Sequence, residues 1–208
     1  MTTSTKRLVV IVGPTGSGKT DLSIRIALHY GAPILSTDSR QMYRGLPIGT
    51  AQPTADQLQA VEHHFIASHD LADNLSCGEY ETARVVRALE VCLQTGLPYS
   101  RLRTGRRRKR DFDIVKVGID MPREELYGRI DHRVGQMLAD GLEAEARAVY
   151  PYRGLNALQT VGYREFFDYF DGRISYDQAV ELIKRNSRRY AKRQHTWFRR
   201  DAEIRWFG

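Results

Sequence analysis

The stretch Gly13-Pro-Thr-Gly-Ser-Gly-Lys-Thr20 follows the pattern G-x-x-x-x-G-K-[ST], typical of a loop whose backbone N–H groups surround a phosphate chain. Before it, residues 7–12 form an apolar, β-branched run that is typical of a buried strand. After it, the apolar residues of 21–28 have helical spacing. A strand, a glycine-rich loop and a helix in this order direct a helix N-terminus toward an anion. The sequence therefore predicts a di- or triphosphate site.

Every residue of this loop is a candidate phosphate-binding residue: Gly13, Pro14, Thr15, Gly16, Ser17, Gly18, Lys19 and Thr20. In such loops the lysine reaches the outer phosphates and the hydroxyl residue binds Mg²⁺. We therefore expect Lys19 to contact the phosphate chain and Thr20 to be the metal ligand. Kinases, NTPases and some transferases share this loop, so it leaves the reaction open.

Length and composition favour one large domain. The chain has 208 residues, of which 41% are hydrophobic, so it can bury a core of its own. It has no apolar run near the roughly 20 residues that span a bilayer, and residues 1–7 lead into a strand rather than a signal-peptide core. The two cysteines, Cys77 and Cys92, lack metal-ligand spacing. We expect a cytoplasmic protein with reduced thiols and no membrane contact.

Positive charge is concentrated in two runs. The net charge is +7, and residues 101–110 carry seven positive side chains while 184–200 carry eight among aromatic residues. The second run has helical spacing, with Ile183, Tyr190 and Trp197 seven residues apart as an expected apolar seam. A solvated charged face is one interpretation, and for 101–110 it stays open. Two such runs in a phosphate-loop protein favour a polyanionic partner.

Strand and helix patterns alternate along the chain. This alternation predicts an α/β fold, a P-loop NTPase-like parallel, doubly wound sheet flanked by helices, with a helical C-terminal part. Residues 1–208 are expected to form one such unit. The predicted elements after the first helix are a strand over 32–37, a helix over 55–63, a short strand over 65–68, a helix over 84–93, a strand over 113–119, helices over 123–139 and 142–150, and two more helices from 174 onward.

A second candidate site is the stretch Asp38-Ser-Arg-Gln-Met-Tyr-Arg44, at the expected carboxyl end of the second strand. Open α/β sheets bind their ligands at this edge. Asp38 could act as a general base beside the phosphates, cap a following helix, or hold a Mg²⁺-bound water. Ser39 and Gln41 offer hydrogen bonds suited to a base edge or a hydroxyl group.

The sequence resembles the tRNA dimethylallyltransferase family from residue 7 to about residue 200. The phosphate loop followed by residues 38–53 has the family's pattern, and His63-His64 lies where the family carries paired histidines. Further motifs resemble those of the family in the same order: 84–91, 126–134, 158–165 and 189–200. The resemblance implies a prenyl transferase that uses dimethylallyl diphosphate and Mg²⁺ to modify N6 of adenosine 37 in the tRNA anticodon stem-loop. A monomer is expected.

The resemblance also implies roles for individual residues. The loop would hold the diphosphate of the prenyl donor, with Arg164 as a second cation. Asp38 would take the proton of the adenine N6, and Thr20 would assist at the leaving group, directly or through Mg²⁺. Residues implied to contact tRNA are Asp38, Ser39, Arg40, Gln41, Arg84, Arg87, Arg189, Lys192, Arg193 and Gln194.

The chain departs from the family pattern at three places. Gln52 replaces the usual lysine, which could remove a phosphate contact, and Arg40 replaces the commoner methionine. Between Thr82 and Ala83 the family carries a strand, a glycine-rich segment and a small helical insertion domain, and this sequence has none of them. We expect a segment to be missing there, and low activity if the chain is really this short.

Two other functions remain open from the residues. A P-loop small-molecule kinase would use ATP, and Asp120 after the strand 113–119 would be its Walker-B carboxylate. Asp120 could equally cap the helix that begins near Pro122. A non-catalytic RNA-binding P-loop protein would bind tRNA whether or not Asp38 is present.

Overall fold

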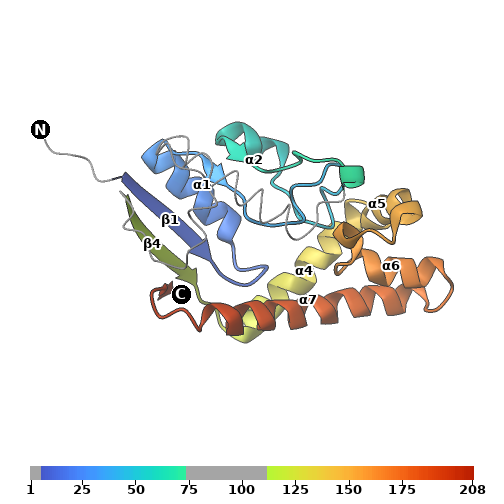
Figure 1. Ribbon diagram of the computed structural model, residues 1–208. Coiled ribbons are helices and arrows are strands. Elements are labelled where there is room, and N and C mark those ends of the chain that lie inside the picture. Colours follow the sequence, from blue (N-terminus) through green and yellow to red (C-terminus); the bar gives the residue numbers. More distant parts are fainter. Residues whose placement is uncertain (1–5, 74–111) are drawn as a thin grey trace, which may run out of the picture.

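The computed structural model describes residues 6–73 and 112–208 (Figure 1). The predicted helix 84–93, the basic run 101–110, the junction between residues 82 and 83, and both cysteines lie outside the described residues. So do Arg84 and Arg87, two of the residues expected to contact tRNA.

The main sheet of the described residues is parallel and has the strand order β1-β4-β5. Strand β1 (Lys6–Val12) pairs with β4 (Phe112–Ile119) over seven residues, and β4 pairs with β5 (Arg205–Phe207). Their β-branched runs favour extended backbone, but residues 7–12 are exposed or half-buried, so the burial predicted for this strand was wrong. The predicted parallel sheet is therefore confirmed, although β5 was not predicted because three residues carry too little pattern.

A second, two-stranded parallel sheet joins β2 (Ile34–Leu35) to β3 (His63–His64). The predicted strand over 65–68 was wrong. Phe65 and Ala67 have φ values of 66° and 45°. This left-handed backbone conformation is incompatible with a strand.

The helices lie around the sheet and extend away from it (Figure 1). They are α1 (Lys19–Tyr30), α2 (Ala55–Ala60), α4 (Arg123–Ala139), α5 (Leu142–Val149), α6 (Tyr163–Phe170) and α7 (Tyr176–Phe198). Short 3₁₀ turns occur at Leu71–Asp73, Tyr150–Tyr152 and Asn156–Leu158. Helix α4 has the predicted bounds. Helix α6 was not predicted, and one long helix, α7, replaces the two expected after residue 174.

Local sequence explains where α2 and α7 begin. Thr54 accepts a hydrogen bond from the backbone N–H of Gln57, whose side chain returns one to Thr54. Ser175 and Gln178 make the same pair of contacts before α7. Such capping boxes satisfy backbone donors that a helix start leaves without partners. Among the described helices, none is long and apolar enough to cross a membrane.

The core lies where α4, α5, α6 and α7 meet. Tyr163, Phe166, Leu142 and Leu158 are fully buried there, and Ile183 of α7 is nearly so. This buried cluster holds α4, α5, α6 and α7 in place relative to one another.

The predicted apolar seam of α7 was only partly right. Ile183 is 2% exposed, but Tyr190 is 43% and Trp197 is 68% exposed. The buried positions are instead Ala179, Ile183 and Ala191. A straight α-helix has 3.6 residues per turn. Side chains seven residues apart therefore do not point in the same direction, and their direction rotates around the helix axis along the chain. Tyr190 and Trp197 are therefore partly exposed to solvent rather than part of a buried seam.

Candidate functional site

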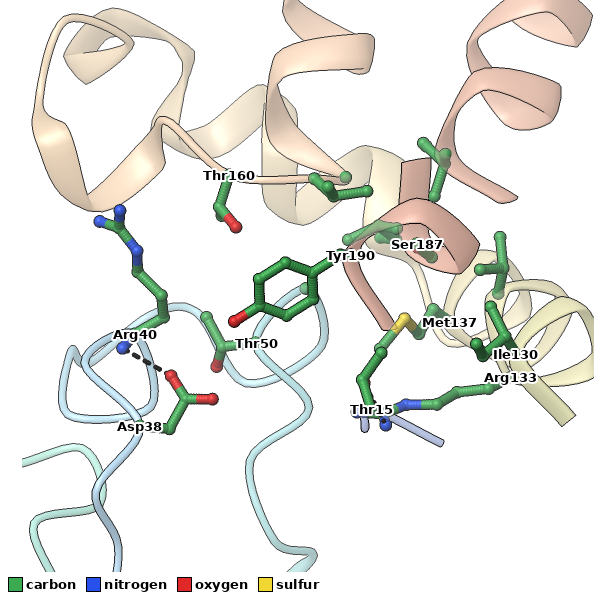
Figure 2. Close-up of a pocket in the computed structure, with 16 residues that line it drawn as sticks. Thr15, Asp38, Arg40, Thr50, Ile130, Arg133, Met137, Thr160, Ser187 and Tyr190 are labelled. Carbon is green, nitrogen blue, oxygen red and sulfur yellow. Dashed lines mark hydrogen bonds between the residues drawn. The ribbon is translucent and has the colours of Figure 1, made fainter. Parts of the chain in front are cut away.

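One pocket of about 120 Å³ joins the phosphate loop, the loop after β2 and the helices α4 and α7 (Figure 2). Its polar side includes Thr15, Asp38, Arg40, Thr50 and Arg133, and its apolar side includes Ile130, Val134, Met137, Leu142 and Ile183. Figure 2 shows Asp38 on the opposite side of the pocket from Thr15 and Arg133. The pocket thus offers a carboxylate, two guanidinium cations and a small apolar surface to one ligand.

The phosphate loop has the backbone conformation that its glycines predict. Gly16 and Gly18 have φ values of 82° and 83°, a region that glycine adopts without strain. Gly18 also precedes the first turn of α1, so the helix N-terminus opens onto the loop. Ser17 is 3% exposed, and its hydroxyl group has no hydrogen-bond partner among the described residues. A buried hydroxyl of this kind is available to a ligand bound in the loop.

Lys19 lies inside the loop, where its ammonium group donates a 2.8 Å hydrogen bond to the backbone oxygen of Pro14. Burial and, to a lesser extent, the charge of Arg133 lower the pKa of Lys19, the charge of Asp38 opposes them, and the net result is a pKa of about 8. The side chain therefore carries a proton at neutral pH only at a cost in free energy. An anion bound in the loop would remove that cost.

Asp38 is held in a tight turn rather than at a helix start. Its Oδ1 accepts a 2.9 Å hydrogen bond from the backbone N–H of Arg40, and its own N–H donates weakly to Ser36 Oγ at 3.4 Å. Residues 39–42 are turns, so the helix-capping interpretation of Asp38 was wrong. The carboxylate is exposed toward the pocket and acts electrostatically on both Lys19 and Arg133.

Two glutamines brace the turn that carries Asp38. Gln41 Nε2 donates to the backbone oxygens of Thr50 and Ala51 at 3.2 and 2.8 Å, and its oxygen accepts from Ser36. Gln52 Nε2 donates to the backbone oxygens of Gln41 and Tyr43 at 3.0 and 2.8 Å. In this structure the side-chain amides of Gln41 and Gln52 both donate hydrogen bonds to backbone oxygens of the protein. The contact of Gln41 with tRNA stays a prediction.

Glu145 of α5 fixes the neighbouring loop. Its two carboxylate oxygens accept the backbone N–H groups of Ile48 and Gly49 at 2.9 and 2.7 Å, and Tyr163 donates its hydroxyl at 2.6 Å. Burial and the Glu145 charge raise the pKa of Tyr163 far above its usual range, so it stays a donor. A Cβ at Gly49 would lie 2.5 Å from the Tyr163 ring. The loop at Ile48 and Gly49 therefore packs tightly against α5 and α6, with no space for a side chain at Gly49.

Replacing Glu145 by glutamine should lower the free energy of unfolding by about 2–4 kcal/mol. The amide –NH₂ group takes the place of one carboxylate oxygen, so a donor then faces the backbone N–H that this oxygen accepted. Urea denaturation followed by circular dichroism measures this. The matched control is Glu143→Gln on the same helix, which removes an exposed ion pair with Arg147 and should cost about 1 kcal/mol or less. Equal losses for the two variants would contradict the role given to Glu145.

Sequence reasoning missed Arg133 as a site residue. It lies on α4 within the stretch 126–134, and its Nη1 donates to Thr15 Oγ1 at 3.3 Å. Burial lowers the pKa of Arg133, and Asp38 opposes that effect. Its helical position was a usable signal, because Ile130, Val134 and Met137 on the same face line the pocket. A cation placed within an apolar stripe is costly in free energy unless an anion pairs with it.

Arg164, predicted to be the second cation, is exposed in the first turn of α6 and does not line the pocket. Its assignment to the diphosphate stays a prediction. Arg40 does line the pocket, and its guanidinium contacts the backbone oxygen of Asn156. Ser39 lies half-buried in the same turn. Thr20 is exposed at the start of α1, beside Lys19.

Helix α7 carries the second basic run, and Ile183, Ser187 and Tyr190 of the same helix line the pocket. Arg189, Lys192 and Arg193 are exposed, and the structure gives none of them an ion pair within residues 6–73 and 112–208. Gln194 has a different position from the one expected: its Oε1 accepts the backbone N–H of Thr15 at 2.8 Å. In this structure it therefore joins α7 to the phosphate loop.

The contacts of Asp120 are neither those of a Walker-B carboxylate nor those of a helix cap, the two roles that the sequence suggested. It accepts hydrogen bonds from His195 at 3.2 Å and from Arg199, both on α7, while Pro122 occupies the position before α4. Burial raises the pKa of Asp120, but these two hydrogen bonds, the charge of Arg199 and the backbone N–H of Met121 together outweigh it, so the pKa is lowered. Asp120 therefore anchors the end of α7 to the sheet.

Comparison with protein families decides the relationship. Residues 81–201 match the IPP transferase family model, and residues 6–94 match the isopentenyl transferase model. The chain belongs to the IPP transferase family. The predicted resemblance is thereby confirmed.

Curated and solved members of the IPP transferase family cover nearly the whole chain. The tRNA dimethylallyltransferase 2 of Porphyromonas gingivalis is 40% identical, over 100% of this chain and 95% of that protein. Among solved structures, the tRNA isopentenylpyrophosphate transferase of Bacillus halodurans has a TM-score of 0.74 at 31% identity, covering 98% of this chain and 90% of that one. The Staphylococcus epidermidis enzyme has a TM-score of 0.76 at 28% identity, covering 97% and 93%. The predicted P-loop α/β fold is confirmed.

Proposed function

We propose that this protein is a tRNA dimethylallyltransferase, which transfers the dimethylallyl group of dimethylallyl diphosphate to N6 of adenosine 37 beside the tRNA anticodon. One observation carries the proposal beyond family membership: the phosphate loop, the Asp38 carboxylate and the basic helix α7 meet at one pocket. The relatives that match the whole chain are transferases of this class. They give no support to the kinase alternative.

The pocket suits both ends of an allylic diphosphate. The anionic end would bind at the loop N–H groups and Lys19, and the five-carbon group would lie against Ile130, Val134 and Met137. In the reaction the bond between the allylic carbon and the diphosphate oxygen breaks while N6 bonds to that carbon. The positive charges stabilise the departing diphosphate, which leaves with the bonding electrons.

Asp38 would receive the proton that N6 loses. The adenine amine is a poor nucleophile because its lone pair is delocalised into the ring, so a base held beside it assists the attack. Within the described turn, the Arg40 N–H binds Oδ1 of Asp38, so Oδ2 is the oxygen proposed to take the proton. The target base must leave the anticodon stack to reach this pocket.

We also propose Mg²⁺ as the metal, with Thr20 as its protein ligand. The described residues contain no group of three or more His, Cys, Asp or Glu side chains that could hold an ion alone. Mg²⁺ commonly keeps several waters and binds through substrate phosphates with few protein ligands, so this donor set fits it. When bound, it would neutralise charge on the diphosphate.

The exposed cations of α7 would hold the tRNA backbone. Arg189, Lys192 and Arg193 lie on the helix whose Tyr190 and Ser187 line the pocket, so a phosphate contact there would place the anticodon loop at its mouth. Such contacts supply affinity and position, whereas base contacts supply selectivity. The proposed place of action is the cytoplasm, with the protein as a monomer.

We infer that the relatives contain a segment that this chain lacks, between residues 82 and 83. The alignment with the Porphyromonas gingivalis relative runs over 286 positions and includes all of the chain's 208 residues, which supports this inference. An intact mass of 23.9 kDa for the expressed protein would show that the chain is truly this short. In that event the proposed activity should be low.

The decisive test is a transfer assay with dimethylallyl diphosphate, Mg²⁺ and unmodified tRNA, read by mass spectrometry of the nucleosides. One prenyl increment on the adenosine beside the anticodon is expected. A parallel reaction with the Porphyromonas gingivalis relative shows that the tRNA is a competent substrate. If that reaction succeeds and this protein adds nothing, the proposed function is wrong for the chain as it stands.

A further inference from the structure

Gln52 stands where the family usually has a lysine, and its side chain contacts the turn that carries Asp38. Its Nε2 donates to the backbone oxygens of Gln41 and Tyr43 at 3.0 and 2.8 Å. A glutamine amide has two N–H donors, and these two contacts use both of them. The remaining polar atom of the side chain is an oxygen, which repels phosphate, and Gln52 does not line the pocket. The side chain of Gln52 therefore has no donor left for a phosphate.

The loop that carries Gln52 is itself held in place. The backbone N–H of Gln52 donates to the oxygen of Pro47 at 2.9 Å, and the Thr50 hydroxyl donates to the oxygen of Leu46 at 2.6 Å. Leu46 is fully buried in the core cluster. Ala51 has a φ of 51°, a left-handed conformation that a residue other than glycine keeps only where its surroundings enforce it. Gln52 thus extends from a rigid loop to the turn.

The turn at Asp38 has long backbone hydrogen bonds of its own. The Asp38 N–H donates to Ser36 Oγ at 3.4 Å, and the Tyr43 N–H donates to the oxygen of Arg40 at 3.3 Å. A shorter bond, at 2.9 Å, runs from the Arg40 N–H to the Asp38 carboxylate, so the backbone of the turn determines where that carboxylate lies. The two bonds from Gln52 join this backbone to the rigid loop.

We propose that Gln52 is a positioning residue for the base of the reaction: it holds the backbone at residues 41 and 43, and through that backbone the Asp38 carboxylate. It does not bind the diphosphate. This inference rests on the proposed function, because it takes Asp38 as the base. A lysine could make the same contacts, since an ammonium group has three N–H donors and two oxygens face it here. The position thus requires a donor rather than a charge.

Gln52→Met keeps the length of the side chain and removes both donors. It should lower the single-turnover rate of prenyl transfer by about 10-fold at saturating tRNA and prenyl donor, because a misplaced reacting group is less effective. The loss is limited because the Ala67 N–H still binds the oxygen of Gln41 at 2.9 Å. The affinity for inorganic pyrophosphate with Mg²⁺, measured by titration calorimetry, should not change. Gln52→Lys should keep the wild-type rate, because it keeps a donor.

A double-mutant cycle tests whether Gln52 acts through Asp38. In a protein that already carries Asp38→Asn, Gln52→Met should cause no further loss of rate, because the residue that it positions is no longer a base. A further loss of about 10-fold would overturn the proposal, since independent effects multiply. The matched control is Gln59→Met, at an exposed position of α2, which should leave the rate unchanged.

Other results would assign Gln52 a different role. Weaker pyrophosphate binding by Gln52→Met would overturn the proposal in favour of a phosphate contact. A variant that is less stable to urea but has the wild-type rate would overturn it in favour of a purely structural role. If Gln52→Met does not fold, Gln52→Asn takes its place in the cycle, because its amide is one methylene too short to reach both oxygens.

Hydrogen exchange measured by NMR separates this inference from the proposed function. In Gln52→Met the Arg40 N–H, which binds the Asp38 carboxylate, should exchange faster, whereas the Gly49 N–H, which Glu145 binds, should not change. Faster exchange at Arg40 in a protein that transfers no prenyl group supports the contact between Gln52 and the turn and contradicts the function. Prenyl transfer by the wild type, with unchanged rate and unchanged exchange in Gln52→Met, overturns the inference alone.

Discussion

Asparagine in place of Asp38 is expected to lower the rate of prenyl transfer by about 10²- to 10⁴-fold, the usual contribution of a positioned base. The substitution keeps an oxygen that can accept the Arg40 N–H, so the turn should keep its shape. Pyrophosphate and tRNA should therefore bind almost as they do to the wild type. The loss should fall on kcat, measured under single-turnover conditions with saturating prenyl donor.

The matched control for this variant is Asp56→Asn, an exposed carboxylate in the first turn of α2. It should leave the rate unchanged. If Asp38→Asn keeps the wild-type rate, Asp38 is not the base and the proton goes to water or to the leaving group. A wild type that binds tRNA without any turnover would instead indicate the non-catalytic RNA-binding protein.

Strong local patterns made part of this fold predictable. The phosphate loop has strict spacing, and its glycines adopt the positive φ values that the pattern requires. Helix α4 was predicted at its true bounds because its apolar spacing is sustained for 17 residues and it begins after Pro122. By contrast, β3 and β5 have two and three residues, and tertiary pairing rather than local pattern defines them.

The site was predictable where chemistry follows a motif and not where it depends on packing. Asp38 was found because the end of a strand next to a phosphate loop is a recognised position for a carboxylate. The family resemblance implied an RNA contact for Gln194, and the fold brings its side chain to the Thr15 N–H, 179 residues away in sequence. Nothing local marks such a contact, or the one between Glu145 and the loop at Gly49.

Lys19→Met tests the phosphate loop beside the pocket, and its expected effect is of similar size. Methionine keeps the apolar stem of the lysine but removes the charge that meets the phosphates. We expect kcat to fall by about 10²- to 10³-fold, as when one preorganised donor to a developing anion is removed. The affinity for inorganic pyrophosphate with Mg²⁺, measured by titration calorimetry, should fall with it.

Without ligand, the same substitution should stabilise the fold, because burial and the nearby charge of Arg133 lower the pKa of Lys19 from 10.5 to about 8 despite the opposing charge of Asp38. The unfolded chain binds the proton more tightly, so the buried charge costs stability in full below pH 8, and the cost disappears as the pH rises to 10.5. Lys19→Met should exceed the wild type by about 2–3 kcal/mol at pH 7, with the difference vanishing near pH 10.5. Urea denaturation of the metal-free protein at several pH values measures this. A variant less stable than the wild type at pH 7 would mean that Lys19 supports the loop in the free protein. A variant that is more stable but inactive would show that Lys19 serves to bind the anionic ligand.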